Sequence, residues 1–408
     1  MKCRHCGAEP RLPFLDLGSA PPSNAFLTDE QLRAPETYYP LRLVVCEDCW
    51  LVQTEDYVGR ESMFNDQYGY FSSYSTSWLA HARNYVDSTC RRFGVGSDSC
   101  LVEVGANDGY LLQYVAKAGI PCYGIEPTDG TAHEARRKGI EIIGSFFGTA
   151  LAEELAAVHR QADVMVANNV LAHVPDINDF VAGFVSLLKL HGVATFEFPH
   201  LLNMVRHNQF DTAYHEHFSY LSLTSVERIF RCNGLAVFDV EEIPTQGGSL
   251  RVYAQRADRG RRPREASVDE LLRREDDAGM RCQDFYTGFQ VRAENLKNDL
   301  LTFLRDAKSD GKRVAAYGAA AKGNTLLNFA GVRSDLLSYV VDKNPAKQRK
   351  FMPGSHIPIL SPAALRERRP DYLLILPWNI ADEVKEEYAD LAEYRVRFVT
   401  AVPQLEVT

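Results

Sequence analysis

Residues 100–112 read CLVEVGANDGYLL, an apolar run that leads through a glycine-bearing turn into helix-forming residues. The run predicts a buried β-strand, and Gly105 and Gly109 permit a close approach of the backbone to a ligand. The start of the following helix would add N–H donors and the positive end of a helix dipole. The turn lacks the GxGxxG order of dinucleotide-binding proteins, so alone it is weak evidence for a nucleotide. It predicts the first βα unit of an α/β domain.

Further strand-like runs follow the first unit. The second, CYGIEP, ends at Glu126, 23 residues after Glu103, where an acid can accept hydrogen bonds from ribose hydroxyls. The later runs are IEIIGSFF, ADVMVANNVLAHV and GVATFEFPH, and the fourth of the series passes through Asn168 and Asn169 toward His173. Five βα units in sequence predict a doubly wound sheet.

The polar residues at these strand ends suit S-adenosylmethionine better than a dinucleotide. A sulfonium favours nearby carboxylates, and it needs no triple-glycine turn to cradle a pyrophosphate. The sequence here resembles class I S-adenosylmethionine-dependent methyltransferases. The resemblance implies a cofactor site formed by Glu103, Gly105, Asn107, Asp108, Glu126 and Asn169, with Asn107 at a position where many members have glycine. The alternative is an α/β domain that binds no cofactor.

The composition is that of a soluble globular protein of two or three domains. The chain has 408 residues, 45% of them hydrophobic, and a net charge of −9, which gives no support for nucleic-acid binding. No apolar run reaches the length of a membrane span, and the first ten residues, MKCRHCGAEP, do not form a secretory signal. We therefore expect a cytoplasmic protein without membrane or nucleic-acid partners. No feature specifies an oligomer, and a monomer remains one alternative.

Two CxxC pairs enclose the N-terminal region. They are Cys3 with Cys6 and Cys46 with Cys49. Two such pairs are the ligand set of a tetrahedral structural Zn²⁺ site, and four thiolates leave no open position for catalysis. The sequence between the pairs predicts a ribbon-like module with an insert that forms loops. The alternative is four reduced cysteines without a metal.

The densest group of titratable residues lies at Asp211–Ser222, DTAYHEHFSYLS. We expect this stretch in a loop beyond the fifth strand, where α/β folds place their chemistry. A solvated surface loop is the alternative.

The stretch at Met63–Trp78, MFNDQYGYFSSYSTSW, is rich in tyrosine, and it predicts either a rim of the site or packing between domains. A helix is expected over residues 75–93.

The C-terminal half predicts a helical brace and a second α/β unit. Residues 267–308 have mostly helical spacing of leucine and phenylalanine, and strand-like runs begin after Lys312. The turn from Gly318 to Asn324, GAAAKGN, is no P-loop, but its helix start and Lys322 can form an anion site; plain packing of the turn is the alternative. Nothing in it supports NAD binding. Arg251, after the turn GGSL, could face a phosphate or pair with an acid.

Four features occur in one order: the CxxC pairs, VEVGANDGYLL, YHEHFSYLS and GAAAKGNTLLN. Together they resemble the sugar C-methyltransferase family, best known for dTDP-sugar C-3 methyltransferases of antibiotic deoxysugar pathways. The resemblance implies an α/β protein with four parts. They are a zinc-binding domain at 1–62, a methyltransferase core at 63–256 with a catalytic loop at 211–222, a linker and brace at 257–310, and a Rossmann-like domain at 311–408.

Carried over by motif, Tyr214, Glu216 and His217 would be active-site residues, with Tyr68 and His173 beside the sugar. A proton next to a C-4 ketone is acidic enough for an enzymic base, and the resulting enolate can attack a methyl donor. We expect His217 as the base, and Tyr214 or His173 as donors to the enolate oxygen. Glu216 would orient the base or hold a sugar hydroxyl.

The expected substrate is a dTDP-linked 4-keto-6-deoxysugar, methylated at C-3. Its substrate-binding residues would be Lys322, Asn324 and Arg251, and its cofactors S-adenosylmethionine and structural Zn²⁺. The alternatives are transfer to C-5, an O- or N-methyltransferase acting on a non-sugar acceptor, and an inactive zinc-ribbon binding protein.

Overall fold

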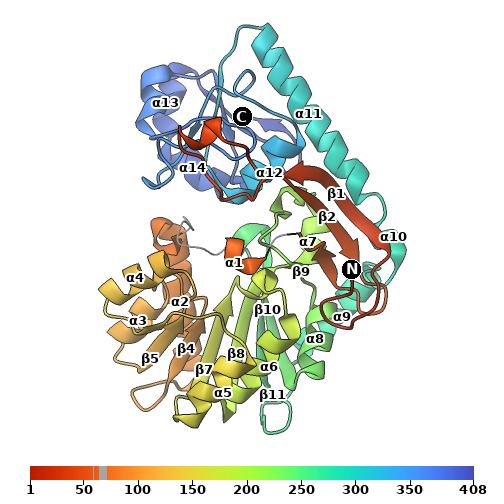
Figure 1. The fold of residues 1–408 in the computed structure, drawn as a ribbon, viewed down its shortest axis with the longest axis vertical. Helices are drawn as coiled ribbons and strands as arrows, with labels where there is room; N and C mark the ends of the chain where they lie inside the picture. Colours follow the sequence, from red (N-terminus) through yellow and green to blue (C-terminus); the bar gives the residue numbers. More distant parts are fainter. Residues whose placement is uncertain (58, 64–70) are drawn as a thin grey trace.

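A computed structural model of the chain describes residues 1–57, 59–63 and 71–408. Figure 1 shows two α/β units, one above the other, with a small antiparallel sheet beside them and the long helix α11 (Phe289–Ser309) running along one side. No helix in these described ranges is long and apolar enough to cross a membrane. The expected α/β class is confirmed.

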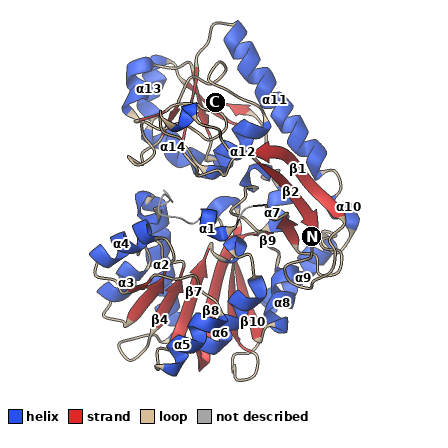
Figure 2. Cartoon of the chain, in the orientation of Figure 1, coloured by secondary structure: helices blue, strands red, loops and turns tan. Residues whose placement is uncertain are grey.

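The core unit contains the predicted doubly wound sheet, in the order β10-β11-β8-β7-β4-β5-β6. The five strands that the sequence predicts pair in parallel, and the hairpin β10–β11 adds two antiparallel strands beside β8. The strands are β4 (Leu101–Val104), β5 (Cys122–Ile125), β6 (Ile142–Ile143), β7 (Ala162–Asn168), β8 (Leu188–Pro199), β10 (Leu235–Ile243) and β11 (Ser249–Arg256). The helices between and around them are α2 (Thr76–Phe93), α3 (Leu112–Lys117), α4 (Asp129–Arg137), α5 (Thr149–Ala157), α6 (Ile177–Leu187), α7 (Leu201–Arg206) and α8 (Leu223–Cys232). Figure 2 shows this sheet with helices on both sides.

The turn after β4 requires its glycines. Gly105 has φ +70°, and a Cβ there would lie 2.5 Å from a methyl group of Val170. Gly109 has φ +75°, and its Cβ would lie 2.5 Å from Ile140. Asn107 between them also has a positive φ, +48°, which asparagine tolerates better than most residues. The tight turn therefore depends on residues that the sequence supplies at these three positions.

The N-terminal sheet contains a fourth strand that the predicted ribbon-like module did not include. Its order is β1-β2-β3-β9, and the first three strands are β1 (Leu12–Ala20), β2 (Tyr39–Val45) and β3 (Val52–Thr54). The fourth, β9 (Ser219–Tyr220), comes from the end of the predicted catalytic loop and pairs antiparallel with β3. The loop is therefore fastened at its C-terminal end into the sheet of the zinc-bearing module.

The helical region is interrupted where glycines have positive φ. It consists of α9 (Ala266–Asp277), α10 (Gln283–Tyr286) and α11, with Gly279 and Gly288 at the breaks. The buried face of α11 packs on the N-terminal sheet, where the rings of Phe14 and Phe289 stack with centroids 4.8 Å apart. This region therefore connects the core unit to the C-terminal unit and also packs on the N-terminal sheet.

The C-terminal unit has a six-stranded sheet in the order β14-β13-β12-β15-β16-β17. It confirms the second α/β unit that the strand-like runs after Lys312 predicted. The strands are β12 (Val314–Tyr317), β13 (Val340–Val341), β14 (Ile359–Leu360), β15 (Tyr372–Ile375), β16 (Arg397–Thr400) and β17 (Glu406–Val407). The helices are α12 (Ala321–Phe329), α13 (Ala363–Arg368) and α14 (Ala381–Glu387). One hydrophobic cluster joins this unit to the N-terminal sheet, α7 and α11.

Candidate active site

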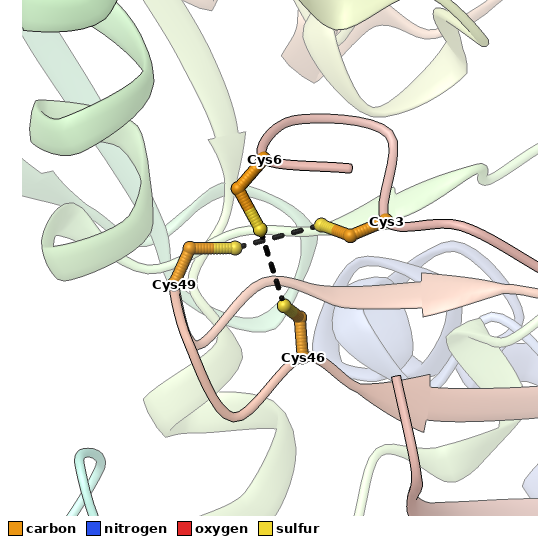
Figure 3. Close-up of side chains that lie close together, drawn as sticks. All are labelled: Cys3, Cys6, Cys46 and Cys49. Carbon is orange, nitrogen blue, oxygen red and sulfur yellow. Dashed lines mark hydrogen bonds between the residues drawn. The ribbon is translucent and has the colours of Figure 1, made fainter. Parts of the chain in front are cut away.

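The four N-terminal cysteines converge on one point (Figure 3). Their sulfur atoms all lie within 4.8 Å of one another, and the pairs Cys3–Cys49 and Cys6–Cys46 are each 3.5 Å apart. Ligands held about 2.3 Å from a tetrahedral Zn²⁺ are separated by about 3.8 Å. The donor set and its spacing therefore fit a structural zinc ion, which four sulfur ligands would enclose completely.

A cavity of about 750 Å³ lies between the carboxyl ends of the core strands and the C-terminal unit. Its walls include Gly105, Asn168 and Pro199 from the core sheet, and Lys322 and Trp378 from the C-terminal unit. Ligands of open α/β sheets bind outside the carboxyl ends of the strands, which is where this cavity opens.

The expected cofactor residues divide into two groups. Those that line the cavity are Gly105, Asn107, Glu126 and Asn169, and those that do not are Glu103 and Asp108. Glu103 is fully buried in β4, and this burial raises its pKa well above the ordinary value. Asp108 accepts a hydrogen bond from the Ser73 backbone and lies 3.4 Å from the Lys138 ammonium.

Glu126 stands at the end of β5, at the position expected for a ribose acid. One carboxylate oxygen accepts a hydrogen bond from the Asn107 backbone N–H at 2.9 Å, and the other accepts from Thr128. Burial raises its pKa, against these hydrogen bonds, which favour the charged form. The carboxylate thus ties the first βα turn to the second strand, on the wall of the cavity.

His217, from the predicted catalytic loop, has one ring nitrogen committed inside the protein. Its Nδ1 lies 3.0 Å from the Thr212 carbonyl oxygen, to which Nδ1–H donates. This contact leaves Nε2 as the unprotonated nitrogen of the neutral ring. The ring lies 3.9 Å from the ring of Tyr214 and 4.6 Å, edge to face, from that of His173, between centroids. All three side chains line the cavity.

Both of these histidines are neutral at pH 7. Burial holds the pKa of His217 well below 6.5, and the nearby His173 and Lys322 lower it further. Burial also lowers the pKa of His173, to about 4. An unprotonated imidazole can accept a proton, so His217 has the charge state that a base requires, with Nε2 as the unprotonated nitrogen.

Glu216 lines the cavity beside them and is almost fully buried. Its Oε1 accepts a hydrogen bond of 2.7 Å from the side-chain amide of Asn24. Burial raises the pKa of Glu216 to about 7, while Asn24 and the charge of Lys347 act in the opposite direction.

His215 has a different environment from its neighbours. Its Nε2 lies 3.2 Å from the carbonyl oxygens of Tyr39 and Pro40 in the N-terminal sheet, and it is absent from the cavity walls. His215 therefore faces away from the cavity, against β2, while its neighbours Tyr214 and Glu216 face into it.

Tyr68 falls outside the described residues, so its place beside the sugar stays a prediction. The C-terminal part of the same tyrosine-rich stretch does reach the cavity, which is lined by Ser72, Ser75 and Trp78. Ser72 donates its backbone N–H to the Asn107 side chain at 2.9 Å.

The C-terminal wall contains a buried charged cluster. The Lys322 ammonium donates to Asn379 at 2.7 Å and lies 4.6 Å from the centre of the Trp378 ring. Burial lowers the pKa of Lys322 to about 8, with the Asp211 carboxylate acting in the opposite direction. Trp378 in turn donates its indole N–H to Asp211 at 2.8 Å. The cluster joins the C-terminal unit to the start of the catalytic loop.

Two expected substrate ligands do not reach the cavity. Arg251 is paired with Glu197 at 2.6 Å and with Glu241 at 3.1 Å, because β11 places it directly opposite Glu197 of β8. This corrects the expected phosphate contact in favour of the alternative, pairing with an acid. Asn324 is fully buried on α12 and is absent from the cavity walls, so its expected role in substrate binding stays a prediction.

Several cavity residues were missed from the sequence. Asn24 lies in the insert that was expected to form loops only, and its contact with Glu216 spans 192 residues. Asn168 has a buried side-chain oxygen without a hydrogen-bond partner among the described residues. His81 of α2 lies 2.8 Å from Glu197. The Asn168–Asn169 pair was a visible signal, whereas nothing local marked Asn24 or His81.

Comparisons with known proteins agree with this architecture along the whole chain. Family models match three successive parts: a zinc binding domain at residues 3–64, a methyltransferase domain at 78–240, and a C-methyltransferase C-terminal domain at 244–403. The C-methyltransferase NovU of Streptomyces niveus is 35% identical over 406 residues, which cover 100% of this chain and 96% of that protein.

Solved structures resemble a smaller part of the chain. Magnesium protoporphyrin IX methyltransferase of Synechocystis PCC 6803, with bound S-adenosylmethionine, is 18% identical with a TM-score of 0.33, over 44% of this chain and 81% of that one. The PH0226 protein of Pyrococcus horikoshii OT3 is 12% identical with a TM-score of 0.39, over 46% and 94%. These TM-scores are too low to assign a function to the chain.

The full-length similarity to NovU and the three domain matches support an S-adenosylmethionine-dependent enzyme over the cofactor-free and inactive alternatives. The cysteine quartet lies within the matched zinc binding domain, which confirms structural zinc. The chain therefore belongs to the sugar C-methyltransferase family that its motifs resemble, and it is an S-adenosylmethionine-dependent C-methyltransferase.

Proposed function

We propose that the enzyme methylates C-3 of a dTDP-linked 4-keto-6-deoxysugar, as a cytoplasmic step in the synthesis of an unusual deoxysugar of an antibiotic. The observation that carries the proposal is the state of His217. Its Nδ1–H is held by the Thr212 carbonyl, so a neutral ring presents Nε2 as a base in a cavity that also contains Tyr214 and His173.

The chemistry explains why a base is needed for transfer to carbon. A sugar carbon is not nucleophilic until the proton next to a ketone is removed. His217 Nε2 takes that proton, and the hydroxyl of Tyr214 or a ring N–H of His173 donates to the enolate oxygen. S-adenosylmethionine, when bound, supplies an electrophilic methyl group. An oxygen or nitrogen acceptor would need no enolate, so this arrangement favours carbon.

Glu216 holds a sugar hydroxyl in this proposal, rather than orienting the base. Its Oε1 is already occupied by the Asn24 amide, and the other oxygen is available to accept from the substrate. The other expected role, orientation of the base, is filled by the Thr212 carbonyl, which accepts the hydrogen bond from Nδ1–H of His217.

Lys322 binds the diphosphate of the nucleotide. It lines the cavity on the wall opposite the core strands, as a helix α12 residue whose burial makes an anionic partner favourable. The positive charge of Lys322 lowers the pKa of His217. A bound diphosphate would offset that charge, so substrate binding would raise the basicity of His217 when the proton has to be taken.

The cofactor lies against the core wall, with its ribose hydroxyls at Glu126 and its adenosine near Gly105 and Asn107. Its methionine end carries an ammonium group, which needs acceptors. Asn168 offers a buried oxygen without a partner among the described residues. The carboxylate of Glu197 can only accept, so His81 donates Nε2–H to it, and Nδ1 is the ring atom that can accept a hydrogen bond. We propose that these two residues bind the ammonium.

The His81→Phe variant is expected to bind S-adenosylhomocysteine about tenfold more weakly, since the loss of one hydrogen bond to a charged group removes about 1.5 kcal/mol. Its affinity for 5′-methylthioadenosine, which lacks the amino-acid end, should stay unchanged. Isothermal calorimetry measures both. The Glu126→Gln variant is the matched comparison, because it should lower the affinity for both ligands. An equal loss of affinity for the two ligands in His81→Phe would contradict this assignment.

The product tests the proposed function. Incubation with S-adenosylmethionine and a dTDP-4-keto-6-deoxysugar should add 14 Da (one CH₂) to the sugar. Nuclear magnetic resonance with a ¹³C-labelled methyl donor should show a new carbon–carbon bond at C-3. A labelled methyl group at C-5 would show that the proposed position, C-3, is wrong. A labelled methyl group on oxygen or nitrogen would overturn the mechanism.

A further inference from the structure

Arg4 lies inside the first zinc-binding turn, between Cys3 and Cys6, yet its side chain points into the protein and is only 4% exposed. Its guanidinium donates to three backbone carbonyls. Nε donates to Phe218 at 3.2 Å, Nη2 to Thr54 at 2.9 Å, and Nη1 to Pro175 at 3.4 Å. The group also pairs with Asp56 and lies 4.8 Å from the centre of the Phe218 ring. One side chain of the zinc module thus contacts three separate segments.

Two of these segments carry the histidines of the cavity. Phe218 directly follows His217, and Pro175 is two residues after His173. The Phe218 backbone N–H donates to Ala172 at 2.8 Å, so the two segments also touch each other. Arg4 therefore lies behind the pair of imidazoles and is bonded to the backbone on both sides.

The third segment supports the same pair. The Thr54 hydroxyl donates to the His217 carbonyl oxygen at 2.5 Å, and the Thr54 N–H donates to the Phe218 carbonyl oxygen at 3.1 Å. The Arg4 backbone N–H in turn donates to the Gln53 side chain at 3.0 Å. These bonds fasten strand β3, the zinc turn and the backbone of the catalytic loop into one unit.

We propose that Arg4 is a positioning residue that fixes the separation and orientation of His217 and His173, with the zinc-bound turn as its rigid base. The inference rests on the proposed role of His217 as the base. Arginine suits the task because its planar group presents five donors in a fixed fork, whereas lysine has a single flexible ammonium. A displacement of about 1 Å at a reacting group can reduce a rate about 10²-fold. The structural zinc would thus support the geometry of the active site from outside it.

The test compares Arg4→Met with two control variants. Arg4→Met is expected to lower kcat with a dTDP-4-keto-6-deoxysugar about 10–100-fold. Zinc content and the affinity for S-adenosylhomocysteine should stay unchanged. His5→Ala, in the same turn, loses a contact with Asn178 of α6 but none with the histidine segments, and should retain wild-type kcat. The exposed Arg11→Met controls for lost positive charge.

A positioning role predicts recovery that a purely structural role does not. Added methylguanidine should restore part of the kcat of Arg4→Ala, and Arg4→Lys should fall between Arg4→Met and the wild type. If Arg4→Met does not fold, Arg4→Lys and the rescue of Arg4→Ala carry the test. Wild-type kcat in Arg4→Lys and Arg4→Met, or a loss that follows zinc content, would overturn the proposal.

Hydrogen exchange separates this inference from the proposed function. In Arg4→Met, amides of the segments around His217 and His173 should exchange faster than in the wild type and in His5→Ala, with or without a sugar substrate. If the wild type does not methylate the keto sugar, the proposed function fails, and this exchange still tests the contacts of Arg4. Unchanged exchange in both segments would contradict the positioning role.

Discussion

The His217→Asn variant is expected to lose about 10²–10⁴-fold in kcat while its affinity for S-adenosylhomocysteine stays at the wild-type value. Asparagine can keep a hydrogen bond to the Thr212 carbonyl but offers no basic nitrogen in place of Nε2. Burial holds the pKa of His217 well below 6.5, so the wild-type ring is already unprotonated from pH 6.5 upward. The ratio of wild-type to variant kcat/KM, which reports the free enzyme, should therefore be nearly constant between pH 6.5 and 8.5. Steady-state rates with the keto sugar measure it.

The neighbouring histidine provides a matched control. His215 lies two residues earlier in the same loop, but its ring contacts the carbonyls of Tyr39 and Pro40 instead of the cavity. The His215→Asn variant should lose stability and keep kcat within a few-fold of the wild type. Full activity in His217→Asn would remove this residue from the mechanism. Equal losses in the two variants would indicate that the loop as a whole, rather than the base, had been damaged.

The Cys46→Ser/Cys49→Ser double variant is expected to lose its zinc and most of its activity. Binding of a structural zinc ion contributes about 10 kcal/mol or more to folding. Since β3 follows Cys49 and pairs with β9, loss of the metal should loosen the strand that begins two residues after His217. We expect the melting temperature to fall by about 10 °C or more, and kcat to fall to roughly 1% of the wild-type value.

Elemental analysis, thermal unfolding and rate measurements check the zinc prediction together. The exposed Cys282→Ser is the control, because it removes a thiol that is far from the quartet in sequence and takes no part in it. It should retain one zinc ion per chain and the wild-type melting temperature. A double variant without zinc that melts and turns over like the wild type would show that the metal does not support this fold.

The sequence was sufficient for features that depend on local patterns. The parallel strands of the core are mostly apolar, and the turn after β4 carries its glycines at the positions where φ is positive. The spacing of the two CxxC pairs was enough to predict a zinc site. In the catalytic loop, the motif indicated Tyr214, Glu216 and His217, and all three line the cavity, whereas no sequence pattern showed which way His215 between them would face.

Features that depend on pairing across long distances could not be read in this way. β9 has two residues, too few for an alternating pattern, and its partner lies far away in the sequence. The side of the sheet on which Arg251 falls is set by the register of β11 on β8, which places it opposite Glu197. Asn24 looked like an ordinary loop residue until the fold placed it against Glu216.

The pairing of β3 with β9 also has a consequence for synthesis of the chain. Val52 pairs with Tyr220, so the N-terminal sheet lacks its last strand until the ribosome has released most of the core unit. At about 5–20 residues per second, that interval is roughly 10–30 s, during which the edge of β3 is unpaired. A nascent chain that has already bound zinc cannot complete its N-terminal sheet until β9 has been synthesised. The first part to be made is therefore completed only after more than half of the chain has been synthesised, and a fragment that ends before residue 219 would expose an unpaired strand edge.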